Sequence, residues 1–106
     1  MPLMYATLKG LSIGDDEFIS YAFKVACKQS GAEIKGRKDC HFVPQGYSAV
    51  MLIAESHAAI HTWPEHGYAK VVFYTCAKDG EQQIEKFCSV WKAFGFKVEQ
   101  KNVVEI

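Results

Sequence analysis

The chain has 106 residues, of which 49% are hydrophobic and 13% aromatic, a composition typical of one globular domain with a single hydrophobic core. Its 12 Lys and Arg balance its 12 Asp and Glu, so the chain lacks the broad cationic surface that nucleic acid or an anionic membrane would require. No apolar run approaches the length of a membrane span, and no basic segment followed by an apolar one begins the chain, so we expect a cytoplasmic protein.

The first half of the chain predicts one helix among three strands, at residues 4–9 (strand), about 15–30 (helix), 32–38 (strand) and 47–55 (strand). The acidic stretch from Gly14 to Glu17 supplies an N-cap and a first turn for the helix. The strand after the helix mixes charged residues with Ile34, and we expect it to return beside the first strand. Residues 39–46 are rich in turn formers and predict a loop.

The second half predicts three further strands and one helix, at residues 56–62 (strand), 68–75 (strand), 81–94 (helix) and 96–105 (strand). A turn at residues 63–67 joins the first two strands, and the helix stops at Gly95. The order β-α-β-β-β-β-α-β separates the helices from a run of strands. It predicts an α+β fold with a single domain, residues 1–106, in which two helices cover an antiparallel sheet as a two-layer sandwich.

Four cysteines, Cys27, Cys40, Cys76 and Cys88, form no CxxC pair of the kind that binds zinc or performs redox chemistry. Cys27 and Cys88 lie beside apolar residues within the two helical patterns, so we expect them to be small buried hydrophobes. An even number of cysteines is by itself a weak indication of disulfides.

A polar cluster interrupts the apolar pattern near the middle of the chain. Glu55, Ser56 and His57 directly follow a run of six apolar residues, and such a conflict with the local pattern is typical of a functional site. His57 and His61 would share one face of a strand, but no third ligand has suitable spacing, so no metal is predicted. A serine hydrolase centred on Ser56 would lack the GxSxG motif. A purely structural role, with these side chains hydrogen-bonded within a sheet, is the remaining alternative.

Three short motifs occur together in this region: Ala-Glu-Ser-His at residues 54–57, Ile-His-Thr-Trp-Pro-Glu at residues 60–65 and Thr-Cys at residues 75–76. With them, the segment from Cys40 to Cys76 resembles the prokaryotic S-adenosylmethionine decarboxylase proenzyme family. The resemblance extends more loosely to the order of strands and helices in the whole chain. It implies an enzyme, a carboxy-lyase that acts on S-adenosylmethionine and makes the aminopropyl donor for spermidine biosynthesis.

Chains of that family cut themselves, and the resemblance implies a cut between Glu55 and Ser56. The products would be a β chain of residues 1–55 and an α chain of residues 56–106. Ser56 would become a pyruvoyl group, the cofactor that forms a Schiff base with the amine of the substrate. The small prokaryotic members act as dimers with active sites at the interface, so we expect a homodimer of processed protomers.

The resemblance also implies roles for side chains around the cut. Ser48 and His61 match residues that act in processing, because a serine hydroxyl is a weak nucleophile without help from a base. Cys76 matches the proton donor, and a thiol with a pKa of about 8.5 is mostly protonated at neutral pH. Phe42 matches the aromatic residue that stacks on adenine, and Glu65 a carboxylate that accepts hydrogen bonds from ribose. Without the resemblance, Ser48 would be a strand-end hydroxyl, Phe42 a core residue and Glu65 a solvated turn carboxylate.

The chain departs from the family pattern at three places. Ala77 stands where the family usually has Gly, Val72 where it usually has Asp, and Lys9-Gly10-Leu11-Ser12 where the first strand often ends in an aromatic residue, Gly and Cys. These departures leave open a related pyruvoyl decarboxylase of arginine or ornithine, or an inactive homologue that does not mature. Phe42 disfavours a short substrate, because such a substrate has no adenine to stack.

Overall fold

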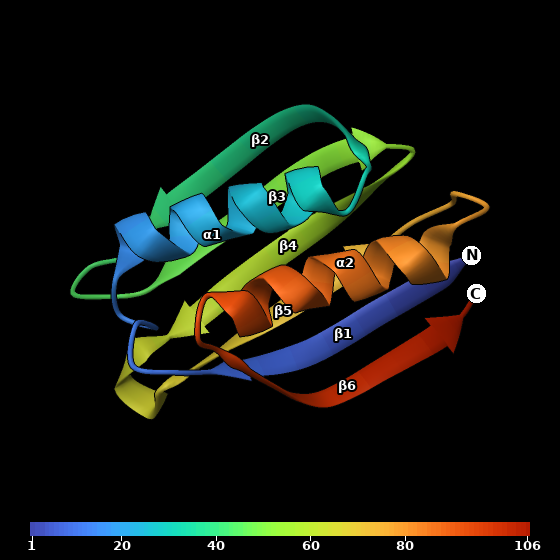
Figure 1. Cartoon of the computed structure of the whole chain (residues 1–106). Coiled ribbons are helices and arrows are strands. Elements are labelled where there is room, and N and C mark those ends of the chain that lie inside the picture. Colours follow the sequence, from blue (N-terminus) through green and yellow to red (C-terminus); the bar gives the residue numbers. More distant parts are fainter.

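The computed structural model describes all 106 residues as one six-stranded antiparallel sheet with both helices on the same face (Figure 1). The elements are β1 (Pro2–Lys9), α1 (Asp16–Gln29), β2 (Glu33–His41), β3 (Tyr47–Ala54), β4 (Ser56–Trp63), the short 3-10 helix η1 (Pro64–His66), β5 (Tyr68–Tyr74), α2 (Gly80–Ala93) and β6 (Lys97–Glu105). The predicted α+β sandwich is therefore confirmed. Neither helix is long and apolar enough to cross a membrane.

The strands follow the order β2-β3-β4-β5-β1-β6 across the sheet, and this order corrects one prediction. Strand β2 does not return beside β1, whose two neighbours are β5 and β6. Instead β2 pairs with β3 alone and forms an edge of the sheet, a place that suits its charged residues. It also continues through His41, so the loop predicted at residues 39–46 shortens to 42–46.

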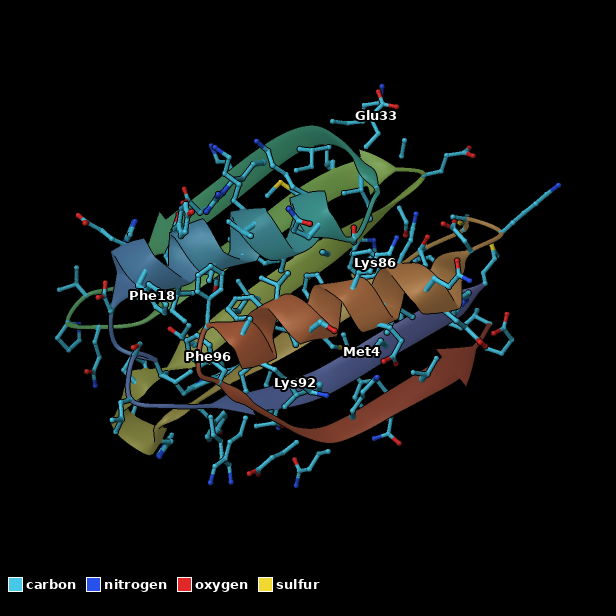
Figure 2. The ribbon with its side chains drawn as sticks, viewed as in Figure 1. Met4, Phe18, Glu33, Lys86, Lys92 and Phe96 are labelled. Carbon is cyan, nitrogen blue, oxygen red and sulfur yellow. The ribbon has the colours of Figure 1, made fainter.

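Helix α1 begins and ends as the sequence predicted. The Asp15 side chain caps the helix by accepting a hydrogen bond of 3.1 Å from the Phe18 backbone N–H. Gly31 follows the last turn with φ of +90°, a left-handed conformation that favours glycine. On α2 the exposed side chains of Lys86 and Lys92 belong to the polar face of the helix (Figure 2).

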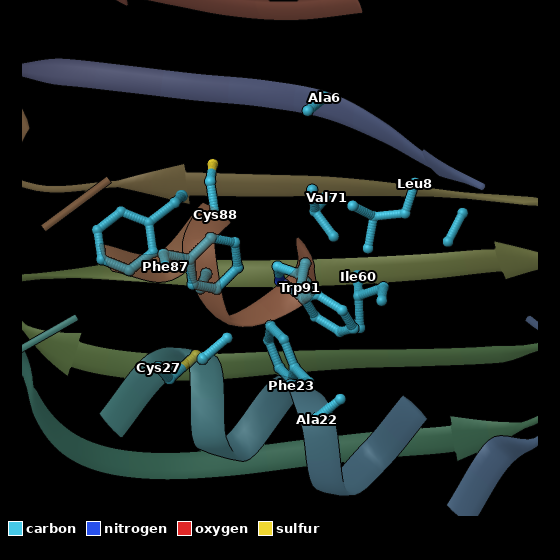
Figure 3. Packing of buried hydrophobic residues seen from close by; sticks show 14 of the residues in the cluster. Ala6, Leu8, Ala22, Phe23, Cys27, Ile60, Val71, Phe87, Cys88 and Trp91 are labelled. Carbon is cyan, nitrogen blue, oxygen red and sulfur yellow. The ribbon is translucent and has the colours of Figure 1, made fainter. Parts of the chain in front are cut away.

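The two helices and the inner face of the sheet bury one core of 23 hydrophobic residues. Phe23 of α1 and Phe87 and Trp91 of α2 meet between the layers, with ring centroids 6.2–6.5 Å apart (Figure 3). Cys27 and Cys88 are buried in this core, as predicted. Burial raises the pKa of the Cys27 thiol to about 12 and raises that of Cys88 as well, so neither provides a thiolate at neutral pH.

The other face of the sheet carries no helix, and we call it the outer face. By strand alternation and register it presents Ser48, Val50 and Leu52 of β3, His57, Ala59 and His61 of β4, Lys70, Val72 and Tyr74 of β5, and Tyr5 and Thr7 of β1. Two of these side chains are large, hydrophobic and exposed: Leu52 is 54% exposed and Tyr5 46%. The sheet therefore has one side packed on helices and one open side on which polar residues lie among apolar ones.

Candidate active site

Ser56 lies at the first position of β4, directly after the tight turn from β3. Its register partner is Ile53, and Glu55 occupies the turn between the two strands. The Ser56 Oγ is buried and has no hydrogen-bond partner. An unsatisfied buried hydroxyl costs about 1–3 kcal/mol, so the Ser56 hydroxyl does not stabilise the fold through a hydrogen bond; the indole N–H of Trp91 is the other buried side-chain group without a partner.

Ser48 and His61 form a second polar group on the outer face. They are direct cross-strand partners of β3 and β4, and the Ser48 Oγ lies 2.7 Å from the His61 Nδ1. Both residues line a cavity of about 450 Å³, which Cys40 of β2 and the apolar side chains of Val50 and Ala59 also line. The pair has the geometry in which a histidine can take a proton from a serine hydroxyl.

Cys76 follows the end of β5, and its thiol is free and exposed. The preceding residue, Thr75, is buried on the helix side, where its hydroxyl donates a hydrogen bond of 2.7 Å to the Gln83 side chain of α2. Cys76 itself lies in the connection between β5 and α2, outside any strand or helix. Tyr74 pairs with His57, the residue after Ser56, and their rings are 5.8 Å apart. Cys76 and Ser56 therefore belong to the same end of the sheet.

The residues predicted to act together are divided between the two ends of the sheet. Ser56 and His61 are five residues apart along β4, a distance of about 17 Å in an extended strand. In Figure 1 the turn between β3 and β4 and the segment after β5 lie near the chain termini, whereas η1 lies at the opposite end. The structure thus brings Ser48 to His61, and Glu55 and Ser56 to the Cys76 end, but it does not bring these two groups together within one chain.

Phe42 and Glu65 lie at the same end as Ser48 and His61. Phe42 begins the loop between β2 and β3, where its backbone N–H donates a hydrogen bond of 2.9 Å to the carbonyl of Gly46. Its ring is 52% exposed, so the alternative of a core residue is wrong. Gly46 has φ of +112°, and a Cβ there would meet the Phe42 side chain at 3.6 Å. Glu65 lies in η1, is exposed and forms no ion pair.

The geometry does not support the metal alternative for His57 and His61. Four residues along a strand separate the two by about 13 Å, too far for both to bind one ion. No group of three or more His, Cys, Asp or Glu side chains comes together anywhere in the structure.

Two polar features of the structure escaped the sequence analysis. On the outer face the Lys70 ammonium donates a hydrogen bond of 2.7 Å to the Thr7 hydroxyl, which in turn donates one of 3.1 Å to Gln100. Below the sheet, Gln83 is buried in the core beside Ile84, where it accepts the hydrogen bond from Thr75. Only Gln83 left a signal in the sequence, as an amide on the apolar stripe of a predicted helix.

The fold and these residues define a class of protein. It is a two-layer α+β sandwich with the unpartnered Ser56 at one end of the sheet and the Ser48–His61 pair at the opposite end. The sequence profile of the family described as S-adenosylmethionine decarboxylase matches residues 5–105. The chain therefore belongs to the S-adenosylmethionine decarboxylase family.

Curated relatives from bacteria and archaea are named S-adenosylmethionine decarboxylase proenzyme. A protein of Geobacillus sp. (strain WCH70) is 52% identical over 64 residues, which cover 60% of this chain and 52% of that protein. A protein of Pyrococcus abyssi (strain GE5 / Orsay) is 40% identical over 83 residues, which cover 76% of this chain and 60% of that protein. The chain thus spans about half the length of the Geobacillus protein.

Two solved structures share the fold. The crystal structure of the adenosylmethionine decarboxylase from Aquifex aeolicus VF5 superimposes with a TM-score of 0.75 and 28% identity, covering 98% of this chain and 88% of that one. The Trypanosoma brucei AdoMetDC-delta26 monomer gives a TM-score of 0.61 at 18% identity and covers 96% of this chain but 44% of that one. The second likeness concerns the fold alone.

Proposed function

We propose that this chain is a proenzyme that cuts itself between Glu55 and Ser56 and then decarboxylates S-adenosylmethionine. The cofactor would be a pyruvoyl group derived from Ser56, and the product would serve spermidine biosynthesis in the cytoplasm. The observation that carries the proposal is the buried, unpartnered Ser56 Oγ within the Ala-Glu-Ser-His motif of a chain that belongs to this family.

The bonds that form and break in self-cleavage all belong to Glu55 and Ser56, which are adjacent in the chain. The Ser56 hydroxyl attacks the carbonyl carbon of Glu55, the peptide C–N bond breaks as an ester forms, and a proton passes to the new amine. Loss of the Ser56 Cα proton then expels the Glu55 carboxylate, after which tautomerisation and hydrolysis release ammonia and leave the pyruvoyl group. A base must take the hydroxyl proton, and a hydrogen-bond donor must stabilise the oxyanion.

We propose that a second copy of the chain supplies that base. The Ser48–His61 pair lies about 17 Å from Ser56 of its own chain, so it cannot serve there. If two outer faces pack on each other around a two-fold axis that crosses the strands, the His61 end of one chain covers the turn that holds Glu55 and Ser56 in the other. Ser56 pairs with the core residue Ile53, so its hydroxyl has to turn from the helix side to meet the His61 that covers the turn. The helix-free outer face, on which apolar residues such as Leu52 and Tyr5 are exposed among polar ones, suits such a homodimer, which would contain two equivalent active sites.

The residues present fit a pyruvoyl cofactor at position 56. Its ketone would supply the electron sink for decarboxylation and make pyridoxal phosphate unnecessary. After CO₂ leaves, the Cys76 thiol at the same sheet end can donate its proton to the α-carbon of the substrate. The exposed Phe42 ring and the Glu65 carboxylate lie at the His61 end, so in the dimer they would bind the adenine and the ribose from the partner side.

The departures from the family pattern lie away from the groups that cut the chain. Val72 is on the outer face, opposite Ala59 of β4 and Tyr5 of β1, where it would be part of the dimer interface. Ala77 follows Cys76, and its N–H donates a hydrogen bond of 3.1 Å to the Thr75 hydroxyl. Val72 would therefore affect the assembly of the dimer, and Ala77 would affect the position of Cys76. The exposed Phe42 favours an adenosyl substrate over arginine or ornithine.

Mass spectrometry of the purified protein under denaturing conditions tests the proposal. We expect two fragments, residues 1–55 and residues 56–106, the second beginning with a pyruvoyl group. The Ser56→Ala variant should stay intact. The processed protein should release CO₂ from S-adenosylmethionine and not from arginine or ornithine. A wild-type chain that remains intact after long incubation would identify a homologue that does not mature.

A further inference from the structure

Thr75 and Gln83 form a buried polar pair under the Cys76 end of the sheet. Thr75 is 2% exposed and Gln83 is 6% exposed, and the Thr75 Oγ1 donates a hydrogen bond of 2.7 Å to the Gln83 Oε1. Gln83 stands on the buried stripe of α2 with Ile84 and Phe87, where an apolar residue would be the ordinary choice. Burying an amide is unfavourable unless it is hydrogen-bonded, so Gln83 depends on Thr75 and Thr75 on Gln83.

Three further contacts hold Thr75 from other sides. Its backbone N–H donates a hydrogen bond of 3.2 Å to the carbonyl of Pro2, and its Oγ1 accepts one of 3.1 Å from the N–H of Ala77. Gly80, the first residue of α2, packs so closely that a Cβ there would lie 2.9 Å from the Thr75 Cγ2. Hydrogen bonds thus hold Thr75 and Ala77, the residues on either side of Cys76. Cys76 itself is exposed, and its thiol forms no hydrogen bond or disulfide.

We propose that Gln83 is a positioning residue for the Cys76 thiol and acts through Thr75. The inference rests on the proposed function, in which Cys76 delivers one proton to one carbon of the bound substrate. Protonation of a carbon of the cofactor instead would consume the cofactor, so the thiol would have to deliver its proton to one carbon and not to the other. Small displacements of a catalytic group lower the reaction rate by large factors. A rigid support for the exposed Cys76 thiol would therefore serve the proton transfer as well as the stability of the fold.

The first experiment needs no cofactor, because it uses the Ser56→Ala chain. Into this background we would place Gln83→Met, which keeps the side-chain length but removes the acceptor, and Gln82→Met as the matched control on the exposed face of α2. Hydrogen exchange at the Ala77 amide should become about threefold to tenfold faster in Gln83→Met only, the range that loss of one hydrogen bond allows. The rate of Cys76 alkylation should change, whereas that of Cys40, also exposed and free, should not.

The second experiment uses the processed protein. Gln83→Met should still be cut between Glu55 and Ser56, but it should complete about threefold to tenfold fewer turnovers before inactivation, with the KM unchanged. Thr75→Ser keeps the hydroxyl and should behave as wild type, whereas Thr75→Val removes the bonds to both Gln83 and Ala77 and should lose at least as many turnovers as Gln83→Met. The double variant should be no worse than Thr75→Val alone.

Unchanged Ala77 exchange and unchanged Cys76 alkylation in folded Gln83→Met would overturn the inference. If Gln83→Met fails to fold, unchanged Cys76 alkylation in folded Thr75→Val, compared with Thr75→Ser, would overturn the inference, because Gln83 is proposed to act on Cys76 only through the Thr75 hydroxyl. The proposed function fails by a different result, namely a wild-type chain that is never cut or releases no CO₂. The two failures are therefore distinguishable.

Discussion

At the scale of single residues, this chain separates reactive side chains from inert ones by burial. Of its four cysteines, Cys40 and Cys76 are exposed, whereas Cys27 and Cys88 lie in the core. Desolvation raises the pKa of both core thiols, because the charged thiolate loses its hydration in an apolar environment. Position within the fold therefore leaves Cys40 and Cys76 as the thiols that solvent or a ligand can reach.

The raised pKa of Cys27 predicts a loss of stability at alkaline pH. The thiol has a pKa of about 12 in the folded chain against 9.0 for a free group, so between these values the folded state holds a proton that the unfolded state has released. The free energy of unfolding should fall by up to about 1.4 kcal/mol per pH unit above pH 9 through this group. Urea unfolding from pH 8 to 11 should show a shallower decline in Cys27→Ala. Equal slopes would mean that Cys27 ionises without cost in the folded chain.

At the scale of elements, β2 depends on side chains rather than on a second neighbouring strand. The buried Tyr47 of β3 accepts a hydrogen bond of 2.7 Å from Arg37 and donates one of 2.7 Å to Asp39, both residues of β2. Arg37 also donates a bond of 2.6 Å to the Ser20 hydroxyl of α1. This network ties the edge strand to the helix layer directly behind Ser48.

Tyr47→Phe tests the network, because it removes one hydroxyl and leaves the ring in place. We expect the free energy of unfolding to fall by about 1–3 kcal/mol, since Arg37 and Asp39 each lose a partner in a partly buried site. In Tyr47→Phe the backbone amides of β2 should exchange hydrogen faster than they do in the wild type, and the increase should be larger than for the amides of β5. Tyr21→Phe is the control, because that tyrosine is exposed and no hydrogen bond involves its hydroxyl. Equal stability of wild type and Tyr47→Phe would show that strand pairing alone holds β2.

The elements were predictable from the sequence because local patterns determine them: alternation in the strands, an acidic cap at Asp15, glycines after both helices. The position of β2 was not, because nothing in residues 32–38 encodes which strand they pair with. Similarly, the sequence motifs predicted Ser48, Ser56, His61 and Cys76 as site residues. They did not predict that these residues lie at two opposite ends of the sheet, because that division depends on the register of the strands. The bond from Thr75 to Gln83 joins elements whose relative placement only the packed structure defines.

At the scale of the whole molecule, the proposed active site is divided, because a single chain holds its Ser48–His61 pair about 17 Å from its Ser56. Its outer face exposes apolar side chains between the Ser48–His61 pair and Ser56, and a second copy would cover that surface. In the proposed dimer, two small chains together would enclose a ligand as large as S-adenosylmethionine.

Leu52→Lys should disrupt this assembly. Leu52 is 54% exposed on the outer face, so the charge should change the stability of the single chain by no more than about 0.5 kcal/mol. Buried in an interface, the same charge would be unfavourable and unpaired. Sedimentation should show a monomer, and cleavage should slow with it. Leu11→Lys, in an exposed loop, should remain dimeric and be cut normally; a monomeric Leu52→Lys protein that is cut at the wild-type rate would exclude catalysis between chains.

Complementation between two inactive chains tests the central claim most directly. Ser56→Ala lacks the nucleophile and His61→Ala lacks the base, so each should stay intact when expressed alone. Co-expressed with different tags, they should form mixed dimers in which the Ser56 of the His61→Ala chain meets His61 of the partner subunit. We predict that mass spectrometry then finds the His61→Ala chain cut between residues 55 and 56 and the Ser56→Ala chain intact. Isolated mixed dimers in which neither chain is cut, or a His61→Ala chain that is cut by itself, would contradict an active site built from two chains.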